Sequence, residues 1–318
     1  MVEVSNLVVT VSADTTAAER GLADLGTKVS GVGSAITTAL GELLIAAVAG
    51  LGAAFVGSVK TAADFEKQLS AISAVSGSTA SELEGIRAVA LQLGKDTSFS
   101  ASEAAAGMEE MVKAGVSLQD VMGGPGKAAL DLAAAGGLSV AESATIASNA
   151  MNTFGKSGTD MAHIADVIAG AANASAIDVH DFGFSLSSVG AVAATIGVNF
   201  EDTAAAIAVL GQAGLKGSDA STSLKTMLLN LSPSSKTATA AFRELGIITA
   251  DGSNKFFDAE GKAKSLAEIS GILQESLKGL TNEQQINALQ TMFGTDAVRA
   301  AAIMAKAGAG ASTRWPRR

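Results

Sequence analysis

The sequence predicts a mainly α-helical protein of antiparallel helical hairpins, or a helix bundle, with short glycine turns. Apolar residues recur at helical spacing along most of the 318 residues. Several of these segments follow a Ser or Thr with Glu or Gln three positions later, a pattern typical of helix starts. Gly is frequent at 35 residues and Pro rare at three, which suits helices that pack closely and end often. Minor β structure is expected at the N-terminus and near residue 250.

Apolar residues three or four positions apart form stripes that predict helices with one buried face. The stripe within residues 181–196 is the clearest. The stripes consist of Phe65, Leu69, Ile72 and Val75; Leu83, Ile86, Val89, Ala90 and Leu93; Phe182, Leu186, Val189, Ala193 and Ile196; Leu224, Met227, Leu228 and Leu231; Leu266, Ile269, Ile272, Leu273 and Leu280; and Ile286, Leu289, Met292 and Phe293.

Start and stop signals agree with these stripes. Capping boxes, in which a hydroxyl and an N3 side chain satisfy orphan backbone N–H groups, are expected at Thr79/Glu82, Ser100/Glu103, Ser139/Glu142, Ser265/Glu268 and Thr281/Gln284. A phrase that begins with Gly and ends in an acid occurs at Gly115–Asp120, Gly137–Glu142 and Gly197–Asp202. Each predicts the end of one helix and the start of the next. Their separations of 22 and 60 residues indicate no strict repeat period.

The first 60 residues predict a strand, a helix and an apolar helix. Leu7–Val11 alternates as a strand does, and Asp14 is a suitable N-cap for a helix that runs to about Ser30. Loops are expected at 123–126, 155–159 and 232–235. A small β element is expected at 247–249 and 256–257, with Asp251-Gly252 in the turn.

One segment raises the question of a membrane. Seventeen uncharged residues, 43–59, lie between Glu42 and Lys60, whereas a span needs about 20. Small residues recur every four positions on one face: Ala46, Gly50, Ala54 and Ser58. Such a face lets helix backbones approach closely. The segment is either a helix packed against neighbours or one that enters a bilayer after a trigger.

Composition excludes several classes of protein. The balance of 22 basic and 31 acidic residues gives a net charge of −9, which argues against binding nucleic acid through phosphate neutralisation. The absence of Cys removes disulfides, thiol nucleophiles and Cys-ligated zinc. The N-terminus lacks the basic region of a signal peptide. Three of the chain's seven Arg and its one Trp fall in the last five residues, which suggests a truncated or frame-shifted end.

No group of residues assembles into a catalytic, cofactor or metal site, so an enzyme is not expected. His163 and Asp166 would share a helix face, but a metal site needs further ligands. His180 lies between two acids, Asp178 and Asp181, whose helix-start positions explain them. Other candidates have structural explanations: Gly155-Lys-Ser157 lacks the earlier Gly of a phosphate loop, Gly31-Val-Gly33 and Gly50-Leu-Gly52 lack the third Gly of a dinucleotide loop, Glu109 and Glu110 suit a solvated face, and Met108, Met111 and Met227 suit core filling.

Taken in order, short motifs over residues 60–305 resemble the core region of phage tail tape measure proteins. These motifs are Ala63-Asp-Phe-Glu-Lys67, Leu91-Gln-Leu-Gly-Lys-Asp-Thr-Ser-Phe-Ser-Ala-Ser-Glu-Ala-Ala105, Met111-Val-Lys-Ala-Gly-Val-Ser117, Ala165-Asp-Val-Ile168, Leu210-Gly-Gln-Ala-Gly-Leu-Lys-Gly-Ser218, Leu228 to Pro233, Phe242-Arg-Glu-Leu-Gly-Ile247 and Met292-Phe-Gly294. The resemblance suggests three regions: an N-terminal region 1–60, a helical core 61–305, and an irregular, possibly truncated tail 306–318.

The resemblance implies a structural protein of the virion tail, present in the host cytoplasm during assembly and acting in tail assembly, length determination and DNA ejection. Implied partners are other copies in the tail lumen, the tail tube protein, tail assembly chaperones, tail tip proteins and, at ejection, the host membrane. No cofactor and no sequence-specific nucleic-acid binding are implied. The chain is expected to be a truncated or prophage-derived member. The alternative is a membrane-active or pore-forming helical protein that uses residues 43–59.

Overall fold

The computed structural model describes residues 60–311. The chain divides into two units, Met1–Ala63 and Asp64–Arg318, and the account below concerns the described part of the second. The strand expected at Leu7–Val11, the helix expected from Asp14 to Ser30, the segment 39–59 and the last residues, 312–318, lie outside the described range.

The described residues are mainly helical, as predicted, with 73% helix. A helix over 60–76 comes first. The others are α3 (Ala80–Asp96), α4 (Ala101–Lys113), α5 (Leu118–Met122), α6 (Pro125–Gly136), α7 (Val140–Thr153), α8 (Met161–Ala174), α9 (Val179–Thr195), α10 (Phe200–Gln212), α11 (Gly217–Leu229), α12 (Lys236–Glu244), α13 (Leu266–Ser276), α14 (Asn282–Phe293) and α15 (Val298–Ala307), with short 3₁₀ turns η1 (Gly158–Asp160) and η2 (Gly308–Ala311).

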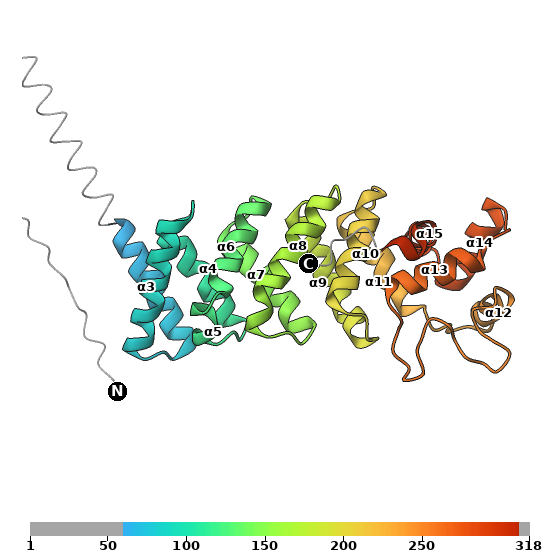
Figure 1. The fold of residues 1–318 in the computed structure, drawn as a ribbon, viewed down its shortest axis with the longest axis horizontal. Coiled ribbons are helices and arrows are strands. Elements are labelled where there is room, and N and C mark those ends of the chain that lie inside the picture. The colour runs from blue at the N-terminus through green and yellow to red at the C-terminus, as the bar shows by residue number, and fades with distance from the viewer. Residues whose placement is uncertain (1–59, 312–318) are drawn as a thin grey trace, which may run out of the picture. The chain divides into compact units, whose positions relative to one another are not determined.

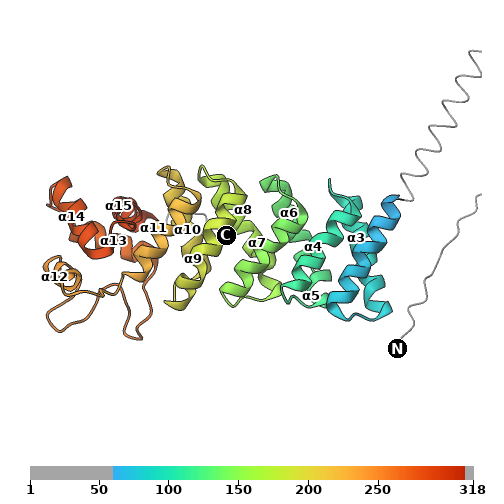
Figure 2. The same ribbon diagram turned by 180° about the vertical axis from the view of Figure 1, so that it is seen from behind.

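Successive pairs of helices follow one another in chain order (Figures 1 and 2). One row consists of α4, α7, α9 and α11, each packed on the next, and a second row consists of α6, α8 and α10. The helices of the first row begin at Ala101, Val140, Val179 and Gly217, at intervals of 39, 39 and 38 residues. The described unit therefore does contain a repeat period, and the prediction of none was wrong.

The reason for that error lies in two kinds of turn that share one sequence phrase. Gly115 and Gly197 precede the second helices of their pairs, α5 and α10, whereas Gly137 precedes a first helix, α7. Distances measured across the two kinds are not multiples of the period. The stop signals themselves are confirmed, because all three glycines have positive φ, between 65° and 90°.

Four of the five predicted capping boxes form in full, at Thr79/Glu82, Ser100/Glu103, Ser265/Glu268 and Thr281/Gln284. The fifth is half formed. The Ser139 hydroxyl accepts from the N–H of Glu142, but the Glu142 side chain does not return to the Ser139 N–H.

The predicted stripes form one continuous apolar core from Phe65 to Ala305, with the exception of a few positions. Val75 and Ile286, both expected in stripes, are 46% and 45% exposed. Glycines allow the first-row helices to approach closely. A Cβ at Gly107 in α4 would lie 2.6 Å from Val140, and one at Gly183 in α9 would lie 2.7 Å from Ile146. The high Gly and Ala content thus serves close helix packing.

The region after α11 departs from the helix pairs. Phe242, Phe256 and Phe293 form a cluster of rings with centroids 5.8 to 6.4 Å apart. The β element expected near residue 250 is reduced to two isolated bridges, Ile248–Asn254 and Phe257–Ala263, with no strand among the residues described. Burial of Phe256 in the ring cluster interrupts any regular pairing there.

Two smaller expectations also change. Residues 123–126 were expected to be a loop, but α6 begins at Pro125, because Pro at the first helical position loses no hydrogen bond. The tail expected to be irregular from 306 is helical in its described portion, through the end of α15 and η2.

Candidate functional site

Polar side chains connect equivalent positions of successive helix pairs, and in four cases the partners are 38 residues apart. Asn152 Nδ2 and Gln212 Nε2 each donate to a carbonyl at the end of a helix in the preceding pair, those of Ala114 and Ala174, both at 2.8 Å. The other two contacts join a His to a Glu. We call these four contacts the inter-pair contacts. They lie at the joints between pairs, where they fix the register of one pair on the next.

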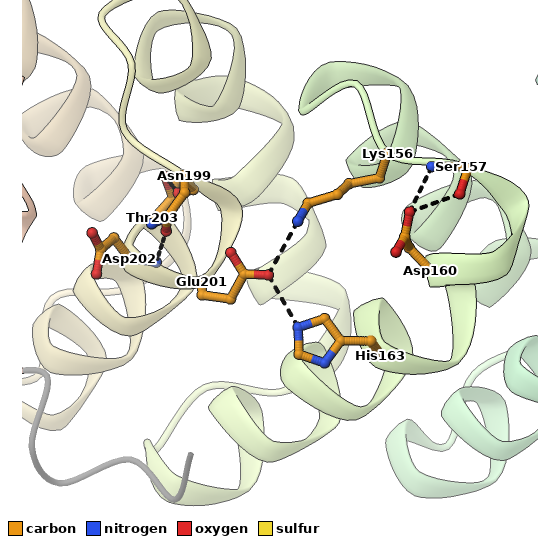
Figure 3. Close-up of polar contacts among 8 residues, drawn as sticks. All are labelled: Lys156, Ser157, Asp160, His163, Asn199, Glu201, Asp202 and Thr203. Atoms are coloured by element: carbon orange, nitrogen blue, oxygen red, sulfur yellow. Dashed lines mark hydrogen bonds and ion pairs between the residues drawn. The ribbon is translucent and has the colours of Figure 1, made fainter. Parts of the chain in front are cut away.

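Figure 3 shows the joint between α8 and α10, where Glu201 receives two cationic partners. His163 Nε2 lies 3.0 Å and Lys156 Nζ 3.4 Å from the same Glu201 carboxylate oxygen. Burial opposes ionisation of Glu201, but bonds from its own backbone N–H and from His163, together with Lys156, outweigh it and lower the pKa of the carboxyl below its usual value. The α10 N-cap, Asn199, orients this first turn by accepting from the N–H of Asp202 at 2.7 Å.

The joint between α7 and α9 carries the second His–Glu contact. His180 Nδ1 lies 2.5 Å from Glu142 Oε1, with 68% of the His side chain and 36% of the Glu side chain exposed. The hydrogen bond to Glu142, its charge and the nearby charges of Asp178 and Asp181 raise the pKa of His180 above its usual value. Asp178 is also the N-cap of α9 and accepts from the N–H of Asp181, as the sequence predicted.

The structure separates the residues considered for metal or phosphate chemistry. His163 pairs with Glu201 rather than with Asp166, and no group of three potential ligands occurs within residues 60–311. Lys156 reaches Glu201, while Ser157 bonds to the Asp160 carboxylate at 2.8 Å. These side chains therefore stabilise turns and joints.

Two further expectations have different outcomes. Met108, Met111 and Met227 are fully buried, which confirms core filling. Glu109 was expected on a solvated face, but its side chain is only 14% exposed, pairs with Lys113 at 2.7 Å and accepts from Gln68. The helix over 60–76, which contains Gln68, covers it, and Glu110 remains the more exposed of the two at 32%.

Sequence reasoning missed the inter-pair contacts. Their signal was present, since Asn152 and Ala114, or His163 and Glu201, are separated by one repeat, but it becomes visible only once the period is known. The proposed small-residue face, Ala46, Gly50, Ala54 and Ser58, lies outside the described residues. Within 60–311 no helix is long and apolar enough to cross a bilayer.

Comparison with known proteins gives the class of protein that this helix-pair unit represents. Residues 87–294, more than half of the chain, match the family model described as phage-related minor tail protein. The chain belongs to that family. No solved structure matches significantly.

Curated relatives point to one kind of tail protein. The chain is 34% identical over 285 residues to the tape measure protein of Pneumococcus phage Dp-1, an alignment that covers 89% of this chain and 23% of that protein. It is 30% identical over 245 residues to the probable tape measure protein of Escherichia phage P2, covering 76% of this chain and 29% of that protein. The chain thus spans about a quarter of the length of these relatives.

Proposed function

We propose that this chain acts in the phage tail as part of a tape measure protein, in tail assembly, length determination and DNA ejection. The observation that carries the proposal is the agreement between the family match at 87–294 and the helix-pair unit. In this role the chain is a structural component and not an enzyme. The buried apolar core and the inter-pair contacts suit a mechanical part.

The proposal extends to organisation and surroundings. The helices of each pair run antiparallel as hairpins within a core of about residues 61–305, preceded by a separate region, 1–60, and followed by the tail 306–318. Partners are other copies in the tail lumen, the tail tube protein, assembly chaperones and tail tip proteins. Assembly takes place in the host cytoplasm, and the final location is the virion tail.

The small-residue face of residues 43–59 is proposed to pack against a neighbouring helix and to contact a membrane only during ejection. The segment is at the short limit for a span, and its regular Ala46, Gly50, Ala54 and Ser58 spacing favours close helix contact. Flotation with vesicles compares the native chain with a variant carrying Leu at positions 50 and 54. Strong spontaneous flotation of the native chain would favour the membrane-active alternative.

Tail length tests the central proposal. In the phage or induced prophage that encodes the chain, residues 140–178 are duplicated in frame, which adds one 39-residue period. If these residues act in the ruler as extended helix, tails lengthen by about 58 Å, at about 1.5 Å per residue. If they act as stacked pairs, the gain is about 10 Å, one interhelix distance.

Electron micrographs of tails from the duplication strain and from a synonymous control provide the measurement. Mass spectrometry of the purified tails shows whether peptides of residues 87–294 are present. Tails of unchanged length would contradict a role in length determination. Peptides found in the lysate but missing from purified tails would contradict a place in the virion.

A further inference from the structure

The half-formed capping box at Ser139 is the starting point. At the other predicted boxes the N3 side chain folds back onto its own N-cap; for example, Glu103 Oε2 accepts from the Ser100 N–H at 2.7 Å. Gln284 does the same at Thr281, at 2.9 Å, so a neutral amide also serves. Glu142 occupies the same N3 position but bonds to His180 on the next helix pair instead. Its carboxylate therefore has two alternative partners.

The surroundings of His180 are acidic. Glu142 approaches from α7, while Asp178 and Asp181 lie on either side of His180 at the start of α9. The other helices that pack on α9 are α8, α10 and α11. Their charged side chains are His163 and Asp166, Glu201 and Asp202, and Asp219 and Lys225. The acids nearest to His180 all favour its protonated form.

The bridge borders an open hollow of about 190 Å³ between α7 and α9. Ile146 and Phe154 line it from the α7 side, and Phe184, half exposed, lines it from α9. Solvent therefore reaches His180, whose proton can exchange without unfolding of either helix. The Glu142 side chain, 36% exposed, also has room to change rotamer.

We propose that Glu142 is a two-position switch controlled by the protonation of His180. With His180 protonated, Glu142 bridges α7 to α9 and holds two successive helix pairs together. With His180 neutral, Glu142 returns to the Ser139 N–H, completes the capping box of α7 and releases the bridge. The joint is then held by apolar packing alone at this point, including the contact between Gly183 and Ile146.

The second His–Glu joint provides a built-in contrast. At His163 the partner carboxylate, Glu201, also lies 3.4 Å from Lys156, which stays positively charged at every pH of interest. Loss of the His163 proton therefore leaves Glu201 with a cationic partner. The structure gives His180 no such substitute, because the one side chain that forms an ion pair with Glu142 among the described residues is His180 itself.

The direction of the pH effect follows from the raised pKa of His180. A group with a folded-state pKa above its unfolded value stabilises the fold fully below the unfolded value, about 6.5, and this stabilisation disappears as the pH rises through the folded pKa. The bridge is thus present in mildly acidic solution and absent in mildly alkaline solution. This inference concerns the folded unit and does not depend on its role in a tail.

NMR of the full chain tests the switch, since the two His residues give only two imidazole titrations to assign. The Ser139 amide proton should shift downfield as the pH rises from 5.5 to 9, with the midpoint of the His180 ring, because it gains a carboxylate acceptor. His180→Ala should keep this proton downfield throughout, and His180→Lys should keep it upfield. His163→Ala, the matched control, should leave the Ser139 titration unchanged.

Glu142→Gln provides a second readout that does not require altered His residues. The variant keeps a capping side chain like Gln284 but loses the charge, so the His180 midpoint should fall toward 6.5. A Ser139 amide that does not follow the His180 midpoint would overturn the switch, as would an unchanged midpoint in Glu142→Gln. Because His180 is 68% exposed, its replacement is not expected to prevent folding.

Discussion

Gly94 has no room for a side chain, and this is a constraint on a single residue. A Cβ built there would lie 2.6 Å from the backbone N of Ala101, at the first turn of α4. The obstacle is backbone, which cannot rotate away as a side chain end can. The absence of a Cβ therefore decides how closely the C-terminal half of α3 approaches α4.

Gly94→Ala should destabilise the unit by about 1–3 kcal/mol, because a methyl group inserted into a packed contact forces a backbone shift. Urea unfolding followed by circular dichroism measures the change. Gly123→Ala is the matched control, since its Cβ would meet neighbours at 3.4 Å, ordinary contact, and its φ is −84°. Equal stability of Gly94→Ala and the native chain would show that α3 and α4 are not held at this distance.

Acidic side chains at helix starts act at the scale of elements. The hydrogen bonds between Glu82 and Thr79, Glu103 and Ser100, and Glu268 and Ser265 lower the pKa of each carboxyl below its usual value. A carboxyl with a lowered folded-state pKa stabilises the fold above its unfolded value, about 4.5, and loses that effect as the pH falls through the folded value. This window lies well below that of His180.

Replacing all three by Gln should therefore flatten the loss of stability between pH 5 and pH 3. The amide still caps, as Gln284 does, but no longer titrates. Thermal unfolding of the triple variant and the native chain at several pH values provides the comparison, and Glu260→Gln, in an exposed loop, is the control. Parallel pH profiles of triple variant and native chain would mean that these caps do not contribute to acid sensitivity.

The whole described unit shares one core. Apolar contacts continue from Phe65 in the first helix to Ala305 in α15, through every helix pair and into the ring cluster of Phe242, Phe256 and Phe293. Each pair buries its apolar face mainly against its neighbours, which is the energetic arrangement of repeat proteins. The core does not require a partner chain to be continuous.

A fragment comprising residues 60–311 should consequently fold by itself. Far-UV circular dichroism should show well over half helix, in line with the 73% of the structure. Limited proteolysis should leave it intact under conditions that cleave a denatured control. A fragment with mainly disordered or β-type spectra would show that the unit depends on residues outside this range.

The sequence by itself determined the helices and their ends. The stripe at Phe182, Leu186 and Val189 and the capping boxes at Ser100 and Thr281 depend on neighbours within one or two turns, so local pattern was sufficient. Resemblance carried by short motifs also indicated the family. The residues of the fold that failed, such as Val75 and Ile286, are apolar positions whose burial depends on what lies opposite.

Only the tertiary structure decided which side chains meet across the joints. The pairings of Glu142 with His180 and of Glu201 with His163 and Lys156 join residues 38 or 45 apart in sequence. Local rules placed Glu142 on its own N-cap, and the stacking of α9 on α7 supplied a competing charged partner. The energy of such a contact depends on distance in space, which the chain acquires only when the helix pairs stack.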